Sequence, residues 1–313
     1  MDDAEANPPL LALTGATGFI GQQLQRQLLA DGFRLRVLLR PGSPRSNNIL
    51  AGVQAVQVHL HDQTGLADAV RGTDAVVYCA GSVRGRSTAD FAAANVDGVG
   101  CLASVLSRLK IPLLLISSLA ASRPEVSDYA ASKAEGERQL RAHPDLAWTI
   151  LRPPAVYGPG DKEMRPILAW VRRGIAFVAG PPGQRLSLLY SEDLAAAVAA
   201  WWRSEAACRH QVFEIDDGQP GGYDWMQIAE AVGRGRVHQI HVHTTLLKVV
   251  AQINWILSGI LGYSPMLTPG KVRELTQDAW VCDNAAFTRI TGWAPTIRLR
   301  EGARRIFDGS GRN

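Results

Sequence analysis

A tyrosine and a lysine in the middle of the chain have the types and the spacing that proton-transfer chemistry needs. Tyr129 and Lys133 are four residues apart in the sequence YAASK, at the start of a predicted helix, so both side chains project from one helix face. An ammonium group beside a phenol favours the phenolate and lowers the pKa of the tyrosine from its usual value of about 10. We therefore expect Tyr129 to exchange a proton with a carbonyl or alcohol oxygen.

Two serines at the end of a predicted strand offer a hydroxyl to hold that oxygen. The apolar stretch LLLISS ends with Ser117 and Ser118, and Ser118 precedes Tyr129 by eleven residues. Ligands of parallel sheets bind at the carboxyl ends of the strands. We expect Ser118 to orient the reacting oxygen. Ser117 is the alternative, its other role being a hydrogen bond at the strand end.

A glycine-rich turn near the start of the chain predicts a nucleotide site. The sequence TGATGFIG places Gly15, Gly18 and Gly21 three residues apart, between a predicted strand at 10–14 and a predicted helix at 20–30. A tight turn, a close approach of the backbone to a pyrophosphate and close packing of the helix on the sheet each require a missing Cβ. The start of the helix adds N–H donors and the positive end of its dipole.

The end of the second predicted strand indicates which dinucleotide binds. An NAD-selective site places an acidic residue there to bind the ribose 2′-hydroxyl, but this chain has Arg40. A guanidinium can hold a 2′-phosphate, with Arg45 as a helper. We therefore predict NADP(H) as the cofactor in preference to NAD(H). Asp62, after the third predicted strand, is a candidate for the adenine edge or for a helix N-cap.

The elements that position these residues alternate between short apolar strands and helices. This pattern predicts an α/β fold with a doubly wound parallel sheet. The predicted strands are 10–14, 35–39, 56–60, 75–78, 113–117 and 148–151, and the predicted helices are 20–30, 65–71, 91–109 and 129–143.

After Pro153 the pattern changes to a less regular unit rich in glycine and proline. Two later segments, a short strand and helix at 186–203 and a strand at 211–215, look like returns to the first sheet. We therefore predict a dinucleotide-binding domain formed by residues 1–156 and 186–216. Residues 157–185 and 217–313 are predicted to form a smaller, mixed C-terminal substrate domain.

Composition excludes several classes of protein. The chain has 313 residues, of which 46% are hydrophobic and 20% charged, so it is not disordered or fibrous. The net charge is +4 without a long basic block, and we expect no nucleic acid partner. The four cysteines lie far apart and no signal pattern opens the chain, which favours reduced thiols and a cytoplasmic location.

The order of the motifs resembles the extended or atypical short-chain dehydrogenase/reductases, the NAD-dependent epimerase/dehydratase family, which have a Rossmann fold. The ending TGWAP followed by LREGARRIF is also typical of that family. The matching segments are TGATGFIG at Thr14, CAG at Cys79, NVDG at Asn95, ISS at Ile116, YAASK at Tyr129, LRPPAVYGPGD at Leu151 and SEDLAAAV at Ser191.

The resemblance implies a role for each matching residue. Tyr129 would be the general acid/base, Lys133 would bind the nicotinamide ribose and tune the tyrosine, and Ser118 would orient the reacting oxygen. Pro153 would border the nicotinamide, and Asn95 matches a family asparagine that can join a proton relay. The expected cofactor-binding residues are Gly15, Thr17, Gly18, Phe19, Ile20, Gly21, Arg40, Asp62, Ala80, Gly81, Asn95, Lys133 and Pro153, with no metal site.

The substrate is expected to be a hydrophobic, lipid-like ketone or secondary alcohol. Ala155 replaces the asparagine that sugar-nucleotide epimerases carry before VYGP, and the chain resembles 3β-hydroxysteroid dehydrogenases, dihydroflavonol-type reductases and bacterial ceramide-pathway reductases, the last also in TPGKVREL at Thr268. Apolar residues at 167–171 either line a pocket or belong to the core. His238, His241 and His243 alternate in a strand-like segment, but no carboxylate is near and we predict no metal there.

The segment 244–267 is very apolar, with Lys248 as its only charge. It is predicted to be a lid over an apolar pocket, a peripheral contact with the inner face of the membrane, or a core helix. The protein is expected to be a monomer or a homodimer.

Two other functions fit parts of the sequence. A nucleotide-sugar epimerase or dehydratase would hold NAD tightly and would use Arg165, Arg172, Arg173 and Arg185 for a diphosphate. A non-catalytic scaffold would bind a nucleotide only for stability, but it would not need Tyr129, Lys133 and Ser118 together.

Overall fold

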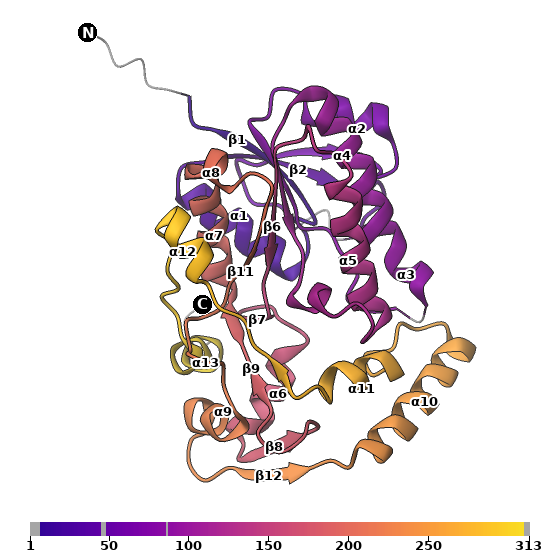
Figure 1. The fold of residues 1–313 in the computed structure, drawn as a ribbon, viewed down its shortest axis with the longest axis vertical. Helices are drawn as coiled ribbons and strands as arrows, with labels where there is room; N and C mark the ends of the chain where they lie inside the picture. Colours follow the sequence, from indigo (N-terminus) through magenta and orange to yellow (C-terminus); the bar gives the residue numbers. More distant parts are fainter. Residues whose placement is uncertain (1–6, 45–47, 86, 310–313) are drawn as a thin grey trace.

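Seven parallel strands form the central sheet of the protein (Figure 1). In this computed structural model, residues 7–44, 48–85 and 87–309 are described. The strands lie in the order β11-β6-β5-β4-β1-β2-β3. Their bounds are β1 Leu10–Thr14, β2 Arg34–Leu39, β3 Gln54–Gln57, β4 Ala75–Tyr78, β5 Leu113–Ile116, β6 Trp148–Arg152 and β11 Gln211–Glu214. From β1 the chain builds the sheet outward through β2 and β3, then crosses back to β4, so the direction of winding reverses between β1 and β4. Ligands of doubly wound sheets bind at this switch point.

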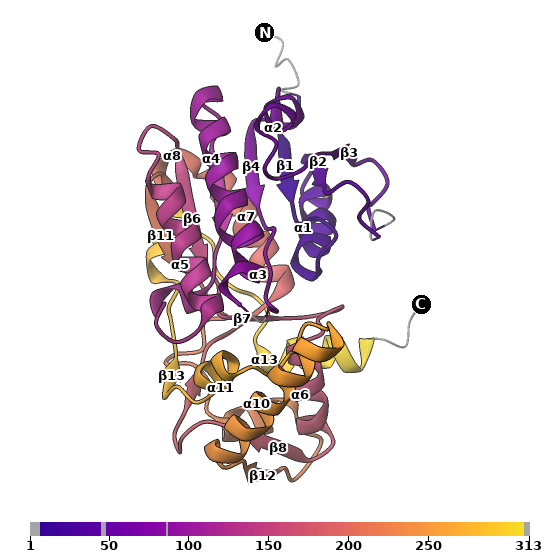
Figure 2. The same cartoon turned by 90° about the vertical axis from the view of Figure 1, so that its right-hand side faces the viewer.

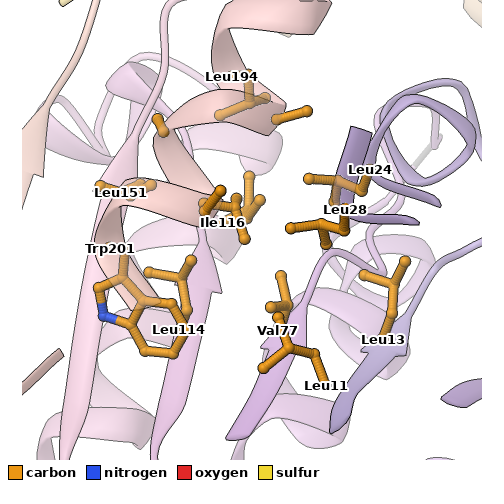
Figure 3. Packing of buried hydrophobic residues seen from close by; sticks show 14 of the residues in the cluster. Leu11, Leu13, Leu24, Leu28, Val77, Leu114, Ile116, Leu151, Leu194 and Trp201 are labelled. Atoms are coloured by element: carbon orange, nitrogen blue, oxygen red, sulfur yellow. The ribbon is translucent and has the colours of Figure 1, made fainter. Parts of the chain in front are cut away.

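Helices cover both faces of the sheet, as the predicted Rossmann fold requires. One face carries α1 (Phe19–Ala30), α7 (Ser191–Arg203) and α12 (Ala285–Thr291). Figure 3 shows Leu24 and Leu28 of α1 and Leu194 and Trp201 of α7 packed over leucine, isoleucine and valine side chains of the strands. The other face carries α2 (Gln63–Val70), α3 (Thr88–Ala92), α4 (Gly98–Leu109) and α5 (Asp128–Arg141).

The remaining chain forms a smaller unit of mixed structure below the sheet (Figures 1 and 2). Its core gathers buried apolar side chains that include Leu168, Ile228 and Leu299. Small parallel strand pairs, β7 with β10, β8 with β12 and β9 with β13, complete it. The elements are β7 (Ala155–Tyr157), α6 (Met164–Arg172), β8 (Ile175–Val178), β9 (Arg185–Leu186), β10 (Leu188–Tyr190), α9 (Trp225–Val232), β12 (His238–His241), α10 (Thr244–Leu261), α11 (Pro269–Leu275), β13 (Ala279–Trp280) and α13 (Leu299–Phe307). The short helix α8 (Glu205–Cys208) instead lies beside the sheet, after α7, and buries Cys208 in the core of the sheet (Figure 1). The exact residues at which one domain gives way to the other remain a prediction.

Some element predictions were wrong in detail. Of the two segments expected to rejoin the sheet, only β11 does so, beside β6; β10 pairs with β7 instead. The reason is that β11 already occupies the free edge of β6, although α7, which follows β10, does pack on α1. Strand β3 ends at Gln57 rather than reaching residue 60, and the helix expected at 91–109 begins at Thr88 and contains a π-helical turn at Ala93–Asp97.

The apolar segment after β12 is not a core helix, so that alternative was wrong. Helix α10 exposes most of its large apolar side chains, and only 11% of it is buried. Two helical stretches in the described chain are long and apolar enough to cross a membrane, Thr88–Leu109 and Thr244–Leu261. The first joins α3 to α4 and packs on the sheet, with Leu102 and Leu106 fully buried.

Candidate active site

The tyrosine and serine predicted to be catalytic come together where β5 and α5 meet. Ser127 caps α5 by accepting a hydrogen bond from the backbone of Ala130 at 3.0 Å, so Tyr129 stands in the first turn of the helix. Ser118 follows β5 and caps a short 3₁₀ turn through Ala120. Its hydroxyl makes a hydrogen bond with the phenol of Tyr129. The fold therefore brings Ser118 and Tyr129, which are eleven positions apart in the sequence, into contact.

The surroundings of Tyr129 keep its phenol protonated. Burial raises the pKa of Tyr129 to about 12, the hydrogen bond with Ser118 lowers it, and the charge of Glu274 raises it. We expected Lys133 to be the residue that lowers this pKa, but Ser118 does so. The ammonium of Lys133 is instead occupied by the backbone carbonyl of Ile116, at 3.0 Å.

The buried ammonium of Lys133 lies close to the backbone of Gly81. Its exposed fraction is 8%, and burial lowers its pKa to about 8, against the opposing effects of Cys79 and Glu137. A Cβ on Gly81 would lie 4.0 Å from the ammonium nitrogen and 3.1 Å from Oδ1 of Asn95. The glycine thus keeps the space in front of Lys133 free, where the family resemblance places a ribose.

Asn95 fixes the loop that carries Gly81. It is buried in the π-helical turn, where its Nδ2 donates to the carbonyl of Ser82 at 3.0 Å and to Oγ of Ser132 at 2.9 Å. Its Oδ1 accepts from the backbone N–H of Ser82 at 3.0 Å. Irregular helical turns of this kind are frequent at functional sites. These bonds give Asn95 a positioning role, while its part in a proton relay stays a prediction.

Ser117 belongs to a buried ionic network. Its hydroxyl donates to Oε1 of Glu137 at 2.6 Å, and Glu137 also receives two bonds from Arg152, at 2.8 and 2.6 Å, and one from Arg141, at 3.1 Å. The hydroxyl of Ser117 is therefore bonded to Glu137 rather than to Tyr129, and Ser118 is the serine beside the phenol. Glu137 was missed by the sequence analysis, although it lies one helical turn after Lys133 on the same face.

The glycine turn is locked to the neighbouring loop. Gly15 has φ +67°, and a Cβ there would lie 2.6 Å from the backbone of both Cys79 and Ala80. Oγ1 of Thr14 accepts hydrogen bonds from both of those N–H groups, at 3.1 Å each. A Cβ on Gly21 would lie 2.2 Å from the carbonyl of Gly15. The loops after β1 and β4 can approach this closely only because these positions are glycines.

The start of α1 has the features of a phosphate cradle. Gly18 caps the helix in an extended conformation, and a Cβ there would meet only the carbonyl of Gly15, at 3.3 Å. Thr17, Phe19 and Ile20 are half-buried in the same turn, and the first turn of α1 carries no acidic side chain. These features fit the pyrophosphate of a nicotinamide dinucleotide.

Other predicted cofactor residues lie at the same edge of the sheet. Arg40 directly follows β2 and is exposed, and within residues 7–44, 48–85 and 87–309 no ion pair to its guanidinium is seen. Arg45 lies outside the described residues. Asp62 accepts a bond from the N–H of Gly65 at 2.9 Å and so caps α2, the alternative role given to it. Buried Pro153 accepts from the N–H of Leu119 at 2.8 Å, next to Ser118.

The smaller unit also reaches the site, through α11. The side chain of Glu274 accepts a hydrogen bond from Ser127, and Arg273 donates to the carbonyl of Val126 at 2.7 Å. Sequence reasoning missed Glu274. One feature of the sequence could have drawn attention to Glu274: it is the first acidic residue after Glu230.

The arginines assigned to a nucleotide-sugar diphosphate do not converge on one point. Arg172 pairs with Asp308, and Arg185 donates to the carbonyls of Gly221 and Gly222. Arg173 lies 5.7 Å over the ring of Trp170, and Arg165 is exposed. The histidines at 238, 241 and 243 are exposed too, and no group of three His, Cys, Asp or Glu side chains in the described chain could hold a metal.

The sheet, the glycine turn and the Ser118, Tyr129 and Lys133 group define a dinucleotide-binding enzyme of the short-chain dehydrogenase/reductase class. Residues 11–215 match the model of the NAD dependent epimerase/dehydratase family, and the chain belongs to that family. Its cofactor is therefore a nicotinamide dinucleotide.

The chain is similar in sequence to two proteins named as reductases and similar in fold to a solved epimerase. The chain is 31% identical over 285 residues to a protein named ceramide reductase from Caulobacter vibrioides (strain NA1000 / CB15N), covering 88% of this chain and 87% of that one. It is 28% identical over 331 residues to a 2-alkyl-3-oxoalkanoate reductase from Stenotrophomonas maltophilia (strain K279a), covering 95% and 98%. The solved structure of the UDP-glucose 4-epimerase of Thermus thermophilus in complex with NAD has a TM-score of 0.68, at 21% identity, over 97% of this chain and 100% of that chain. That last likeness is one of fold.

Proposed function

We propose that the protein is an NADP(H)-dependent oxidoreductase that reduces a ketone of a hydrophobic, lipid-like substrate, or oxidises the matching secondary alcohol. The observation that carries the proposal is the hydrogen bond between Ser118 and Tyr129, one helical turn from the buried ammonium of Lys133. A scaffold that only binds nucleotide has no chemical need for this group. The names of the two relatives, both reductases, support the same reaction class.

Ser118, Tyr129 and Lys133 each have a separate task in the reaction. When bound, the dinucleotide supplies the hydride that adds to the carbonyl carbon. Ser118 donates a hydrogen bond to the carbonyl oxygen, and Tyr129, protonated at neutral pH because its pKa is about 12, donates the proton that completes the alcohol. Lys133, with a pKa of about 8, is largely charged at neutral pH and would hold the nicotinamide ribose, while water reprotonates the phenolate.

The choice of NADP(H) rests on Arg40. This residue stands at the end of β2, where an NAD-selective enzyme carries an acid, and its exposed guanidinium is available to a 2′-phosphate. Charge-assisted, paired hydrogen bonds make arginine well suited to that group.

A lipid-like substrate is supported by apolar side chains on the smaller unit. Phe177 of β8 and Ile240 of β12 are directly paired in register, and Trp170 of α6 contacts the ring of Phe177. Their exposed fractions are 44%, 45% and 45% in that order. We propose a sphingolipid or ceramide-type ketone, or a sterol-like ketone. The protein would act in the cytoplasm, as a monomer or homodimer.

The test is a cofactor-oxidation assay with purified protein. Loss of NADPH absorbance is followed with a long-chain 3-oxo lipid, with a sterol ketone and with UDP-glucose. We expect turnover with a lipid ketone and none with the sugar nucleotide. Turnover of UDP-glucose, with tightly bound NAD that survives purification, would instead make the protein an epimerase.

A further inference from the structure

Helix α10 carries a continuous row of exposed apolar side chains. They recur at intervals of three and four residues and therefore occupy one arc of about 140° around the helix. The exposed fractions of these side chains range from 43% to 75%. We call the following residues the apolar stripe: Leu246, Val249, Val250, Ile253, Ile256, Leu257, Ile260 and Leu261.

The opposite face of α10 is held by the rest of the protein, so the direction of the stripe is fixed. Ala251 and Ser258 are completely buried there. Nδ2 of Asn254 donates to the carbonyl of Leu267 at 2.8 Å, which ties α10 to the segment leading into α11. Figure 1 shows α10 at the outer edge of the smaller unit, and Figure 2 shows it on the near side. The apolar stripe thus faces away from the protein.

The charged residues in the sequence around α10 indicate which kind of partner the apolar stripe contacts. From residue 231 to residue 273 the chain contains no Asp or Glu, but it contains five Lys or Arg residues and three His residues. Of these cations, Arg234 pairs with Asp308 and Lys271 with Glu274, whereas Arg236 and Lys248 are exposed and form no ion pair within the described residues. An apolar stripe in a segment that has no acidic residue and keeps unpaired cations fits a negatively charged lipid surface, which attracts basic residues near its headgroups. A helix of 18 residues is about 27 Å long, near the lower limit for crossing a bilayer. Because α11 packs against one side of α10, lipid cannot surround the helix as it would surround a spanning helix, and a position in the bilayer surface fits better.

We propose that α10 lies in the surface of an anionic lipid bilayer, with the apolar stripe inserted among the acyl chains. The docked helix is then one short segment away from the catalytic helix, because α11 follows α10 and contacts Ser127 and Val126. A lipid that leaves the bilayer beside α10 is presented near Tyr129. This last step rests on the proposed function, whereas the docking itself does not.

A pair of neighbouring substitutions tests the docking. Ile253→Glu places a carboxylate in the stripe, and Gln252→Glu places the same group at the adjacent exposed position outside it. The full chain is sedimented with vesicles of equal parts phosphatidylcholine and phosphatidylglycerol, and with vesicles of phosphatidylcholine alone. We expect wild type and Gln252→Glu to bind the anionic vesicles, and Ile253→Glu to bind them about tenfold to hundredfold more weakly, the loss of one buried aliphatic side chain. Binding to the neutral vesicles should be weaker for all three.

The outcomes separate this proposal from the alternatives. Wild type that stays in solution with both vesicles, or equal binding by both variants, would overturn it. A wild-type dimer that Ile253→Glu converts to a monomer, without vesicle binding by either, would show that the stripe binds a second copy. Turnover of a short, water-soluble ketone should be the same in Ile253→Glu and wild type, so a failure of the proposed function is seen independently. If Ile253→Glu melts early, Ile260→Glu, at a side chain 75% exposed, replaces it.

Discussion

Glu274 accepts a hydrogen bond from Ser127, the residue that caps the helix carrying Tyr129. The two residues lie 147 positions apart in the sequence. Glu274 is 8% exposed, and its other oxygen accepts from the ammonium of Lys271 at 2.8 Å. The smaller unit thereby contributes a buried charge to the environment of the Tyr129 phenol.

Replacing Glu274 by Gln should move the pH profile of the enzyme. The charge of Glu274 disfavours the phenolate and raises the pKa of Tyr129, so its removal lowers that pKa. Oxidation of the alcohol needs the ionised phenol, and the rising limb of kcat/KM against pH should therefore shift to lower pH. Gln keeps an acceptor for Ser127, which preserves the cap. The matched control, Glu301→Gln on α13, removes an exposed carboxylate and should leave the profile in place; an unmoved profile in Glu274→Gln would remove Glu274 from the electrostatics of the site.

Replacing Tyr129 by Phe should abolish turnover without weakening cofactor binding. The substitution deletes only the hydroxyl that bonds to Ser118, the group proposed to donate the proton. We expect kcat to fall by about 100-fold to 10,000-fold, the usual contribution of a general acid/base. NADPH affinity, measured by fluorescence titration, should stay within a few-fold of wild type because the hydroxyl acts in the transition state. A variant that keeps its activity would show that another group carries the proton.

Replacing Arg40 by Asp should reverse the cofactor preference. In the proposed function the guanidinium binds the 2′-phosphate, whereas a carboxylate would repel that phosphate and accept a bond from a ribose 2′-hydroxyl. We expect the KM for NADPH to rise by about tenfold to hundredfold, the value of a charge-assisted hydrogen bond, while the KM for NADH changes little or falls. Steady-state kinetics with both cofactors measure this. Equal losses for the two would mean that Arg40 does not contact the 2′-phosphate.

Local sequence patterns predicted the strands of the sheet and the helix that carries Tyr129. Contacts between segments far apart in the sequence determined the features that these patterns missed. The strand at Ala75–Tyr78 and the helix of Tyr129 follow from local apolar patterning and a cap, so the sequence predicts them closely. The partner of β10 depends on which edge is already taken, and no local pattern records that. Periodicity likewise shows that α10 has an apolar face, but not whether anything covers that face.

The network around Glu137 should be important for stability rather than for chemistry, and two glutamates on α5 provide the comparison. Glu137 is 2% exposed, accepts from Ser117, and pairs with Arg152, whose side chain is only 17% exposed. Glu137→Ala leaves that arginine buried without its partner, and we expect the free energy of unfolding to fall by about 3–5 kcal/mol. Glu135, two residues earlier, pairs with exposed Arg138 on the surface, and Glu135→Ala should cost less than about 1 kcal/mol. Urea unfolding of both variants measures the difference. Similar losses would mean that water reaches the Arg152 pair, because only its exclusion makes the unpaired charge so costly.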